Sequence, residues 1–321
     1  PFSSRRRHTR SRLLSRGLGD VYKRQGCINA AFRLTDNDQD YFIKTNDVTK
    51  AQMFEAEAEG LEEMASSNTI RVPVPVCYGA HDNQCYIVME YLDMGGSADM
   101  AELGQQFAAM HRVTTERYGW RMDNTIGSTP QPNAWMHDWI EFWRERRLGY
   151  QLELAARNGY GGELQRLGER LLSDMPALFN NHDPEPSMLH GDLWGGNYGA
   201  LRDGTPVIFD PAFYYGDREA DLAMTGLFGG FGANFYAAYN EAWPVDQGHE
   251  VRKTFYNIYH IINHANLFGG AYHGQAVSMM ERVLAEISGP GVQVTRSIVI
   301  STMLAARRGT RGEVGMRGSS V

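Results

Sequence analysis

Cysteine is scarce in this sequence, and no long uninterrupted apolar segment is present. The three cysteines, Cys27, Cys77 and Cys85, form no CxxC pair and have no histidine at ligand spacing, which argues against a disulfide scaffold and a structural zinc site. The most apolar stretch, 298–306, is interrupted by two hydroxyl side chains and is shorter than the roughly 18 to 20 residues that cross a bilayer. We therefore expect a protein of a reducing, cytoplasmic compartment without a membrane partner.

Basic residues are also scarce in the central part of the chain. Residues 26–288 contain 18 basic and 36 acidic residues, a net charge of −18, whereas the whole sequence carries −7. Such a surface repels a phosphate backbone, so we expect no nucleic-acid partner, and a cationic small molecule is electrostatically favoured. With 42% hydrophobic residues over 321 positions, the chain is able to bury the core of one large or two smaller domains.

Residues 1–25 differ in composition, with eight basic residues and one acidic residue. They lack the apolar core of a secretory signal. The strings SSRRRHTR and DVYKRQ are typical of translated sequencing-adapter read-through, and we interpret 1–25 as a non-native segment. A transit peptide and a nucleic-acid-binding arm are the alternatives.

The remaining sequence divides into two regions by its hydrophobic pattern. Residues 26–92 contain one helical segment at about 50–64 and four strand-like runs, CINAAFRL, YFIK, VPVPVCYG and CYIVMEYL. After residue 93 the pattern becomes mostly helical, with helices expected over 100–111, 135–148, 163–172 and 254–267. One exception, 186–212, has the short apolar runs and turn residues of a loop and a β-hairpin. The pattern predicts an α+β fold, and residues 289–321 form an unassigned tail.

The strongest chemical signal is the pair Asp192 and Asn197 in the string HGDLWGGN, followed by Asp210 after the apolar run Val-Ile-Phe. This is the spacing of a kinase catalytic loop and its metal-binding aspartate. Phosphoryl transfer needs a carboxylate near the attacking hydroxyl and hard oxygen ligands for Mg²⁺, which takes few protein ligands. For each residue taken singly, capping of a turn is the alternative.

Two charged residues stand upstream in the order that a kinase needs. Lys44 closes the strand YFIK, and Glu57 lies on the apolar face of the next helix, where an unpaired carboxylate is costly. An ion pair between Lys44 and Glu57, with the lysine reaching nucleotide phosphates, satisfies both side chains. Taken separately, each is more often an ordinary surface charge.

The sequence resembles the fructosamine kinase (ketosamine-3-kinase) family, within the group of aminoglycoside phosphotransferases and choline kinases. The resemblance covers roughly 26–284 and is carried by the strings GCIN, FIKTN, MFEAEAEGL, VPVPVCYG, HGDLWGGN, VIFDPAFYYGDREADLA and FGGF. It implies a two-lobed, protein-kinase-like fold, with a small β-rich nucleotide-binding N-lobe at 26–92 and a larger, mainly helical C-lobe at 93–288. It also implies the use of ATP and Mg²⁺.

The resemblance further implies roles for individual residues. Asp192 becomes the base that orients or deprotonates a sugar hydroxyl, while Asn197 and Asp210 hold Mg²⁺. Lys44 and Glu57 become the pair that positions the phosphates. The expected nucleotide contacts are the loop residues Gly26, Cys27, Ile28 and Asn29 and the hinge residues Met89, Glu90, Tyr91 and Leu92. The expected substrate contacts are His190 and Trp194.

Some of these assignments have alternatives. The hinge segment 89–92 is equally compatible with an edge strand that leaves the sheet, and Trp194 with a residue that packs its own loop. Cys27 occupies a position where many relatives carry a cysteine able to form a redox-sensitive disulfide between subunits, so a monomer or such a homodimer is expected. The alternative for Cys27 is a small apolar filler.

The activity implied is the transfer of the ATP γ-phosphoryl group to a hydroxyl, O3, of a free or protein-linked ketosamine, in the repair of glycated amines. One alternative is another small-molecule kinase, acting on an aminoglycoside, choline or a homoserine-like amine. A second is a catalytically impaired nucleotide-binding pseudokinase. Relatives have two or more glycines before the Cys-Ile segment, whereas only Gly26 is present here, so we expect weakened ATP affinity.

Two further groups of residues, a histidine pair and two acidic residues, are weaker candidates for a functional site. His260 and His264 are four residues apart on a helix, but the glutamate of a zinc-protease motif is missing, which favours histidines of the core or the substrate lobe. Asp138 and Glu141 are candidates to receive a cationic amine, although a solvated helix face is the favoured interpretation.

Overall fold

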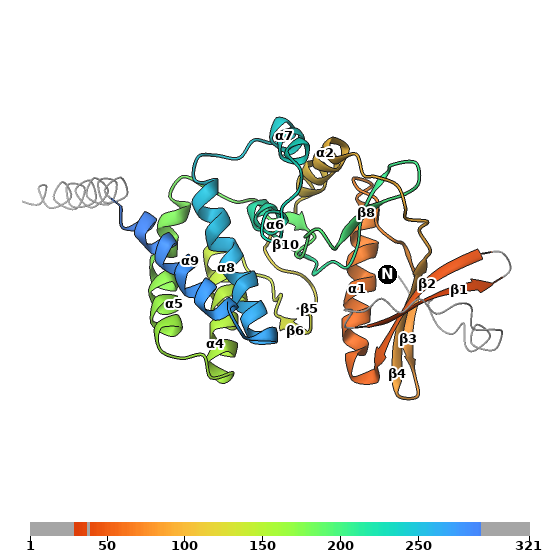
Figure 1. Cartoon of the computed structure of the whole chain (residues 1–321), viewed down its shortest axis with the longest axis horizontal. Coiled ribbons are helices and arrows are strands. Elements are labelled where there is room, and N and C mark those ends of the chain that lie inside the picture. Colours follow the sequence, from red (N-terminus) through yellow and green to blue (C-terminus); the bar gives the residue numbers. More distant parts are fainter. Residues whose placement is uncertain (1–28, 37–38, 290–321) are drawn as a thin grey trace, which may run out of the picture.

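The computed structural model describes residues 29–36 and 39–289 and shows two lobes joined by a short connection (Figure 1). The sequence interpretations for Gly26, Cys27 and Ile28 lie outside the described residues. Within those residues no helix is long and apolar enough to cross a membrane.

The N-lobe is one antiparallel sheet with a single helix against it. The strands lie in the order β1-β2-β4-β3, and the helix α1 packs on the last two of them. In sequence order the elements are β1 Ala30–Asp36, β2 Gln39–Asp47, a 3₁₀ turn Val48–Lys50, α1 Ala51–Ser66, β3 Pro75–His81 and β4 Gln84–Glu90. The predicted apolar face of α1 is confirmed, since Phe54, Ala58 and Leu61 are buried.

The C-lobe is mainly helical, with three small two-stranded sheets. Its elements are α2 Met100–His111, β5 Asn124–Ile126, β6 Thr129–Gln131, α3 Trp139–Trp143, the π-helical turn Arg144–Leu148, α4 Gly149–Arg157, α5 Glu163–Asp174, a 3₁₀ turn Met175–Phe179, β7 Ser187–Leu189, β8 Tyr198–Ala200, β9 Pro206–Ile208, β10 Tyr214–Gly216, α6 Arg218–Thr225, α7 Ala233–Ala242, α8 His249–Phe268 and α9 Tyr272–Ile287. The two-lobed, protein-kinase-like fold is therefore confirmed.

Two of the predicted helices have different bounds. The helix expected over 135–148 begins only at Trp139, because the Asp138 side chain caps it by accepting the Glu141 amide proton at 2.9 Å. Residues before the cap are extended, since Met136 forms a backbone bridge to Tyr118. The helix α8 begins five residues before the expected start, because its first turn carries few apolar side chains to mark it.

The region 186–212 contains the predicted loop and hairpin. Strand β7 pairs with β10, and β8 pairs with β9 as the hairpin. The loop that carries Asp192 lies between β7 and β8, and Asp210 is the second residue after β9. Strand β8 lies on the side of the C-lobe toward the N-lobe (Figure 1), and Asp210 there contacts Lys44 of the N-lobe.

Candidate active site

The structure brings Lys44, Glu57 and Asp210 together between the lobes. The Lys44 ammonium lies 2.6 Å from Glu57 Oε1 and also donates to Asp210 Oδ1. Lys44 is placed by the β2–β4 pairing, in which it lies opposite Ile87, and Glu57 by the second turn of α1. The predicted ion pair is confirmed, and it extends to the aspartate that follows β9.

Electrostatics keep the Lys44 side chain charged. Burial by itself would lower its pKa, but the carboxylates of Asp210 and Glu57 raise the pKa above its ordinary value. Lys44 is consequently a fixed cation in a site that would otherwise carry only negative charge.

The catalytic loop begins with a glycine that no other residue can replace without strain. Gly191 has φ +82°, and a Cβ atom there would collide with the carbonyl oxygen of Ala212. The carboxylate of Asp221, on the buried helix α6, accepts the amide protons of His190 at 2.6 Å and Gly191 at 2.7 Å. Asp221 thereby fixes the backbone from which Asp192 projects.

Asp192 lies among other carboxylates. Its pKa is raised well above the ordinary value, first by desolvation in the cleft and then by the charges of Asp210 and Asp221. The Asn197 side-chain amide opposes this rise in pKa by donating to the Asp192 carboxylate at 3.5 Å, and it is held there by a second bond to the Asp192 backbone carbonyl at 2.8 Å. A cluster of carboxylates with an adjacent amide oxygen is a donor set suited to a hard divalent cation.

Asp210 has a backbone conformation that is rare for a residue with a side chain. Its φ is +59°, in the left-handed region, which aspartate tolerates better than most residues. Its side chain keeps 48% of its surface exposed while one oxygen contacts Lys44. Asp210 is thus held at the wall of the cleft with a second carboxylate oxygen available to a ligand.

The interpretation of His190 as a substrate contact is wrong. Its side chain is fully buried, and its Nε2 donates to the carbonyl oxygen of Phe209 at 2.9 Å. Its Nδ1 accepts the amide proton of Asp192 at 3.2 Å, and burial lowers its pKa. His190 supports the catalytic loop from below as a neutral imidazole.

Trp194 lies at the surface of the same loop. Its side chain is 40% exposed, and its ring covers Gly196, where a Cβ atom would collide with it. The ring also lies edge-on to Phe228, with ring centroids 6.4 Å apart. Trp194 therefore packs its own loop and is also partly exposed, so both roles considered for it stay predictions.

The residues predicted to contact the nucleotide fall into two groups. The Asn29 side chain accepts a hydrogen bond from Asn46 at 2.6 Å, beside strand β2. In the hinge segment, the Met89 side chain is buried and Glu90 bonds to Arg71 and to the Val74 amide. These two hinge residues offer only backbone groups to a ligand.

Past the end of β4, the backbone is partly free. The Tyr91 ring is covered by the Arg33 guanidinium, 4.5 Å from its centroid. The Leu92 carbonyl accepts the Met94 amide proton at 2.9 Å, whereas the Leu92 amide has no backbone acceptor among the described residues. The predicted hinge therefore has a donor to offer at Leu92.

The helix α1 is joined to the C-lobe by Glu63. Its carboxylate accepts the Trp120 indole proton at 2.9 Å and the Tyr215 hydroxyl proton at 2.8 Å. One turn earlier, a Cβ atom at Gly60 would lie 2.9 Å from the Cβ of Phe213. Phe213 and Tyr215 belong to the segment after Asp210, so the helix that carries Glu57 is positioned against the segment that carries Asp210.

We expect Gly60→Ala to lower kcat/KM for ATP by roughly tenfold, because the added methyl group must push α1 away from Phe213 and lengthen the Glu57–Lys44 contact. Initial rates at varied ATP measure this. Gly161→Ala is the control, since a Cβ atom there meets nothing within 4 Å. Equal kinetics for the two variants would show that the close approach does not position Glu57.

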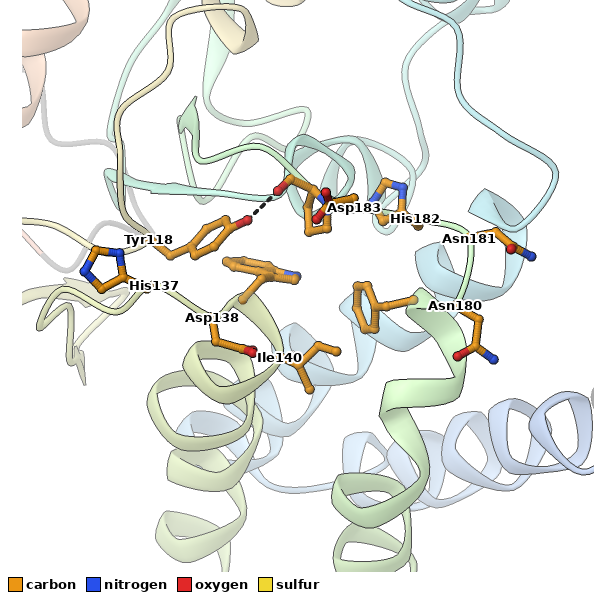
Figure 2. A pocket seen from close by; sticks show the side chains of 11 residues that line it. Tyr118, His137, Asp138, Ile140, Asn180, Asn181, His182 and Asp183 are labelled. Carbon is orange, nitrogen blue, oxygen red and sulfur yellow. Dashed lines mark hydrogen bonds between the residues drawn. The ribbon is translucent and has the colours of Figure 1, made fainter. Parts of the chain in front are cut away.

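A separate hollow lies at the other end of β7, before the strand rather than after it (Figure 2). It has a volume of about 540 Å³ and is closed on one side by the Tyr118 hydroxyl, which donates to the carbonyl of Pro184. Asp138 lines it, while Glu141 pairs with Arg144. The two acids that were candidates for an amine are thus a helix cap and a surface ion pair, away from Asp192.

Sequence reasoning missed Asp221 and Glu63, and it gave no role to Phe228. A signal existed for Asp221, because a carboxylate directly before the apolar run Leu-Ala-Met must find hydrogen-bond donors once that run is buried. No comparable signal existed for Glu63, which is one of several glutamates along α1. His260 is buried, and its pKa is lowered to about 3 by burial, as expected of a core histidine.

Comparison with known proteins also indicates a kinase, in agreement with the geometry of the site. Residues 20–286 match the family model described as fructosamine kinase, a match that begins inside the segment 1–25. A probable ketoamine kinase of Synechocystis sp. is 48% identical over 262 residues, which cover 81% of this chain and 88% of that protein. The chloroplastic protein-ribulosamine 3-kinase of Arabidopsis thaliana is 47% identical over 264 residues, 81% of this chain and 80% of that protein.

Solved structures are similar as well. A crystal structure described as a fructosamine-3-kinase from Thermobifida fusca has a TM-score of 0.73 and 31% identity, covering 85% of this chain and 96% of that chain. An aminoglycoside phosphotransferase in a ternary complex with ADP and hygromycin B has a TM-score of 0.57 at 14% identity, covering 85% and 95%. At 14% identity, the similarity to the aminoglycoside phosphotransferase concerns the fold alone.

Proposed function

Because this chain belongs to the fructosamine kinase family and therefore to the kinases of ketosamines, we propose that it transfers the γ-phosphoryl group of ATP to hydroxyl O3 of a ketosamine. The acceptor would be a ribulosamine or fructosamine formed on an amine. Phosphorylation at this position destabilises the sugar–amine adduct, so the proposed role is the repair of glycated amines and proteins.

The observation that carries this proposal is the cluster Lys44, Glu57 and Asp210 beside the loop of Asp192. Lys44 is charged and is held by one carboxylate from each lobe, and its ammonium group is of the kind that donates to phosphate oxygens in kinases. Asp192 projects from a backbone fixed by Asp221 and has its carboxylate within 3.5 Å of the Asn197 amide. Phosphoryl transfer depends mainly on such positioning and charge.

The residues present fit MgATP. Asp210 has an oxygen that Lys44 does not use, and the Asn197 amide nitrogen is engaged, which leaves its side-chain oxygen for a cation. We assign Asp210 and Asn197 as the residues that would hold Mg²⁺, because hard carbonyl and carboxylate oxygens are its preferred ligands. When bound, MgATP supplies the phosphoryl group and a positive charge that offsets the clustered carboxylates.

Residues of this chain bind the two substrates and accept the proton of the hydroxyl. Asp192 accepts a hydrogen bond from O3 and takes its proton as the bond from O3 to the γ-phosphorus forms, while the bond from that phosphorus to the β,γ-bridging oxygen breaks and ADP leaves. The Leu92 amide donates to the adenine, and Trp194 covers one face of the sugar.

The test is a substrate panel with ATP and Mg²⁺ that includes ribulosyl-lysine, fructosyl-lysine, kanamycin and choline. We expect a new phosphate ester on the ketosamines, detected at O3 by ³¹P and ¹³C NMR, and no turnover of kanamycin or choline. Turnover of kanamycin or choline alone would replace the proposal with an antibiotic- or choline-kinase activity. If ATP binds but nothing on the panel or among the corresponding psicosyl and erythrulosyl adducts is phosphorylated, the pseudokinase alternative is favoured.

A further inference from the structure

A buried polar network lies beneath the segment that follows Asp210. Its centre is three amide side chains in and just after the β5–β6 hairpin, Asn124, Gln131 and Asn133, which are at most 9% exposed. The hairpin lies between α8 and α1 (Figure 1). It packs on α1 through β5, and the Tyr259 hydroxyl of α8 donates to Gln131 Oε1 at 2.7 Å. Amides buried this deeply cost free energy unless they are hydrogen-bonded, so their partners define what the network holds.

The amides of Gln131 and Asn124 have one consistent orientation. Asn124 Oδ1 accepts from Gln131 Nε2 and from Asn133 Nδ2, both at 2.9 Å, so Asn124 Nδ2 points the other way. There it donates to the carbonyl of Phe213 at 2.8 Å. Gln131 Nε2 also donates to the carbonyl of Ala212 at 3.1 Å. The hairpin therefore directs two amide donors at two consecutive carbonyls of the backbone.

The Ala212 carbonyl stands where the two catalytic segments touch. A Cβ atom at Gly191 would collide with this oxygen, so the backbone just before Asp192 is packed directly on it. Ala212 is also two residues after Asp210, whose φ of +59° persists only because the surrounding structure holds it. The donor on Gln131 thus fixes a point that sets the positions of both Asp192 and Asp210.

The hairpin is itself anchored from its other side by Arg147. The guanidinium of Arg147 is fully buried and donates to Asn133 Oδ1 and to the Pro132 carbonyl, both at 2.7 Å. It also lies over the Tyr214 ring of β10, 4.0 Å from the centroid. The oxygen and nitrogen of each of the three amides are hydrogen-bonded, and a buried network paired in this way is rigid. The core therefore holds the two donors in place.

We propose that Gln131 is a positioning residue of the reaction, whose side-chain amide holds the Ala212 carbonyl so that Asp210 keeps the orientation in which it binds Mg²⁺. The proposal rests on the proposed function, in which Asp210 is a ligand of Mg²⁺. Gln131 is 1% exposed, so it acts through the backbone rather than by contact with a substrate.

The test variant is Gln131→Met, which keeps a side chain of similar length and removes both donors. We expect about tenfold weaker affinity for Mg²⁺, since losing an outer partner of a metal ligand typically costs about 10- to 100-fold. The Mg²⁺ dependence of ADP binding, followed by tryptophan fluorescence, measures this affinity. The Kd for ADP in EDTA should stay within about threefold of wild type, because Asp210 then has no metal through which to act on the nucleotide.

Tyr259→Phe is the matched control. It removes another buried hydrogen bond of the Gln131 side chain but leaves the donors to Ala212 and Asn124 in place. We expect it to lose a similar unfolding free energy in urea, because one buried polar atom is unpaired, while its Mg²⁺ affinity stays within about twofold of wild type.

Equal Mg²⁺ affinities in Gln131→Met and Tyr259→Phe would reduce Gln131 to a structural role and overturn the proposal. If circular dichroism shows that Gln131→Met is unfolded in buffer, all three proteins are compared in trimethylamine N-oxide, which favours the folded state. The readout needs no ketosamine. A loss of Mg²⁺ affinity in Gln131→Met therefore supports the proposal even if no ketosamine is phosphorylated. If ADP binding by wild type does not respond to Mg²⁺, both this proposal and the assignment of Asp210 are overturned.

Discussion

Replacing Asp192 with asparagine lowers kcat by at least about a thousandfold in our expectation, because the amide is unable to accept the proton of the sugar hydroxyl. Asparagine has nearly the same shape, and the loop is fixed through the amides of His190 and Gly191 rather than through this side chain. Affinity for ATP should therefore change by less than about threefold. A coupled assay of ADP release gives kcat, and ligand-induced changes in tryptophan fluorescence give the Kd for ATP.

The matched control is Asp203→Asn, an aspartate in the exposed turn of the β8–β9 hairpin whose carboxylate accepts the Thr205 amide proton. It removes the same charge from the hairpin that follows the catalytic loop, so a general loss of negative charge would affect both variants. If Asp192→Asn retained a tenth of the activity, Asp192 would be a positioning group and another acceptor for the proton would be required.

The second large effect is expected for Lys44→Met, which removes the cation shared by Glu57 and Asp210. We expect kcat/KM for ATP to fall by about 100- to 1000-fold, because the charge that contacts the phosphates is lost. The variant also leaves Glu57 buried without its partner, which costs about 3 kcal/mol of unfolding free energy. Initial rates and urea denaturation measure the two effects separately.

A double variant distinguishes the two roles of Lys44. In the Lys44→Met background, Glu57→Gln removes the unpaired charge, so most of the lost stability should return while the activity stays low. Recovery of activity together with stability would mean that Lys44 acts only by keeping α1 in place. Unchanged instability would mean that Glu57 is protonated or hydrated once its partner is gone.

The sequence was most informative where a spacing has a chemical meaning of its own. Asp192, Asn197 and Asp210 were identified from spacing, and the structure places all three on one side of the C-lobe, with Lys44 and Glu57 opposite. The strands and helices of the N-lobe followed from periods of two and of about four residues. In both cases the information is local, so a window of a few residues contains it.

Errors arose where the outcome depended on distant residues. His190 is next to the catalytic aspartate in sequence, but the carbonyl of Phe209 and the core beneath the loop bury it. The start of α3 was placed too early because the hydrophobic pattern of 135–148 continues through the cap at Asp138. Glu63 could not be identified, because its partners Trp120 and Tyr215 are 57 and 152 residues away.

The attachment of α1 through Glu63 also determines how the cleft is able to open. In a two-lobed enzyme, exchange of the nucleotide usually requires the lobes to separate. Here α1 packs on the sheet through β3 and β4, yet its far side is hydrogen-bonded to the C-lobe. Because separation at α1 would break those two bonds, we expect the sheet rather than α1 to move when the lobes separate, with release of the Lys44–Glu57 pair. We therefore expect amide hydrogen exchange to be slow in α1 and fast along the outer strand β1. In that case α1, although it belongs to the N-lobe in sequence, stays with the C-lobe while the sheet moves.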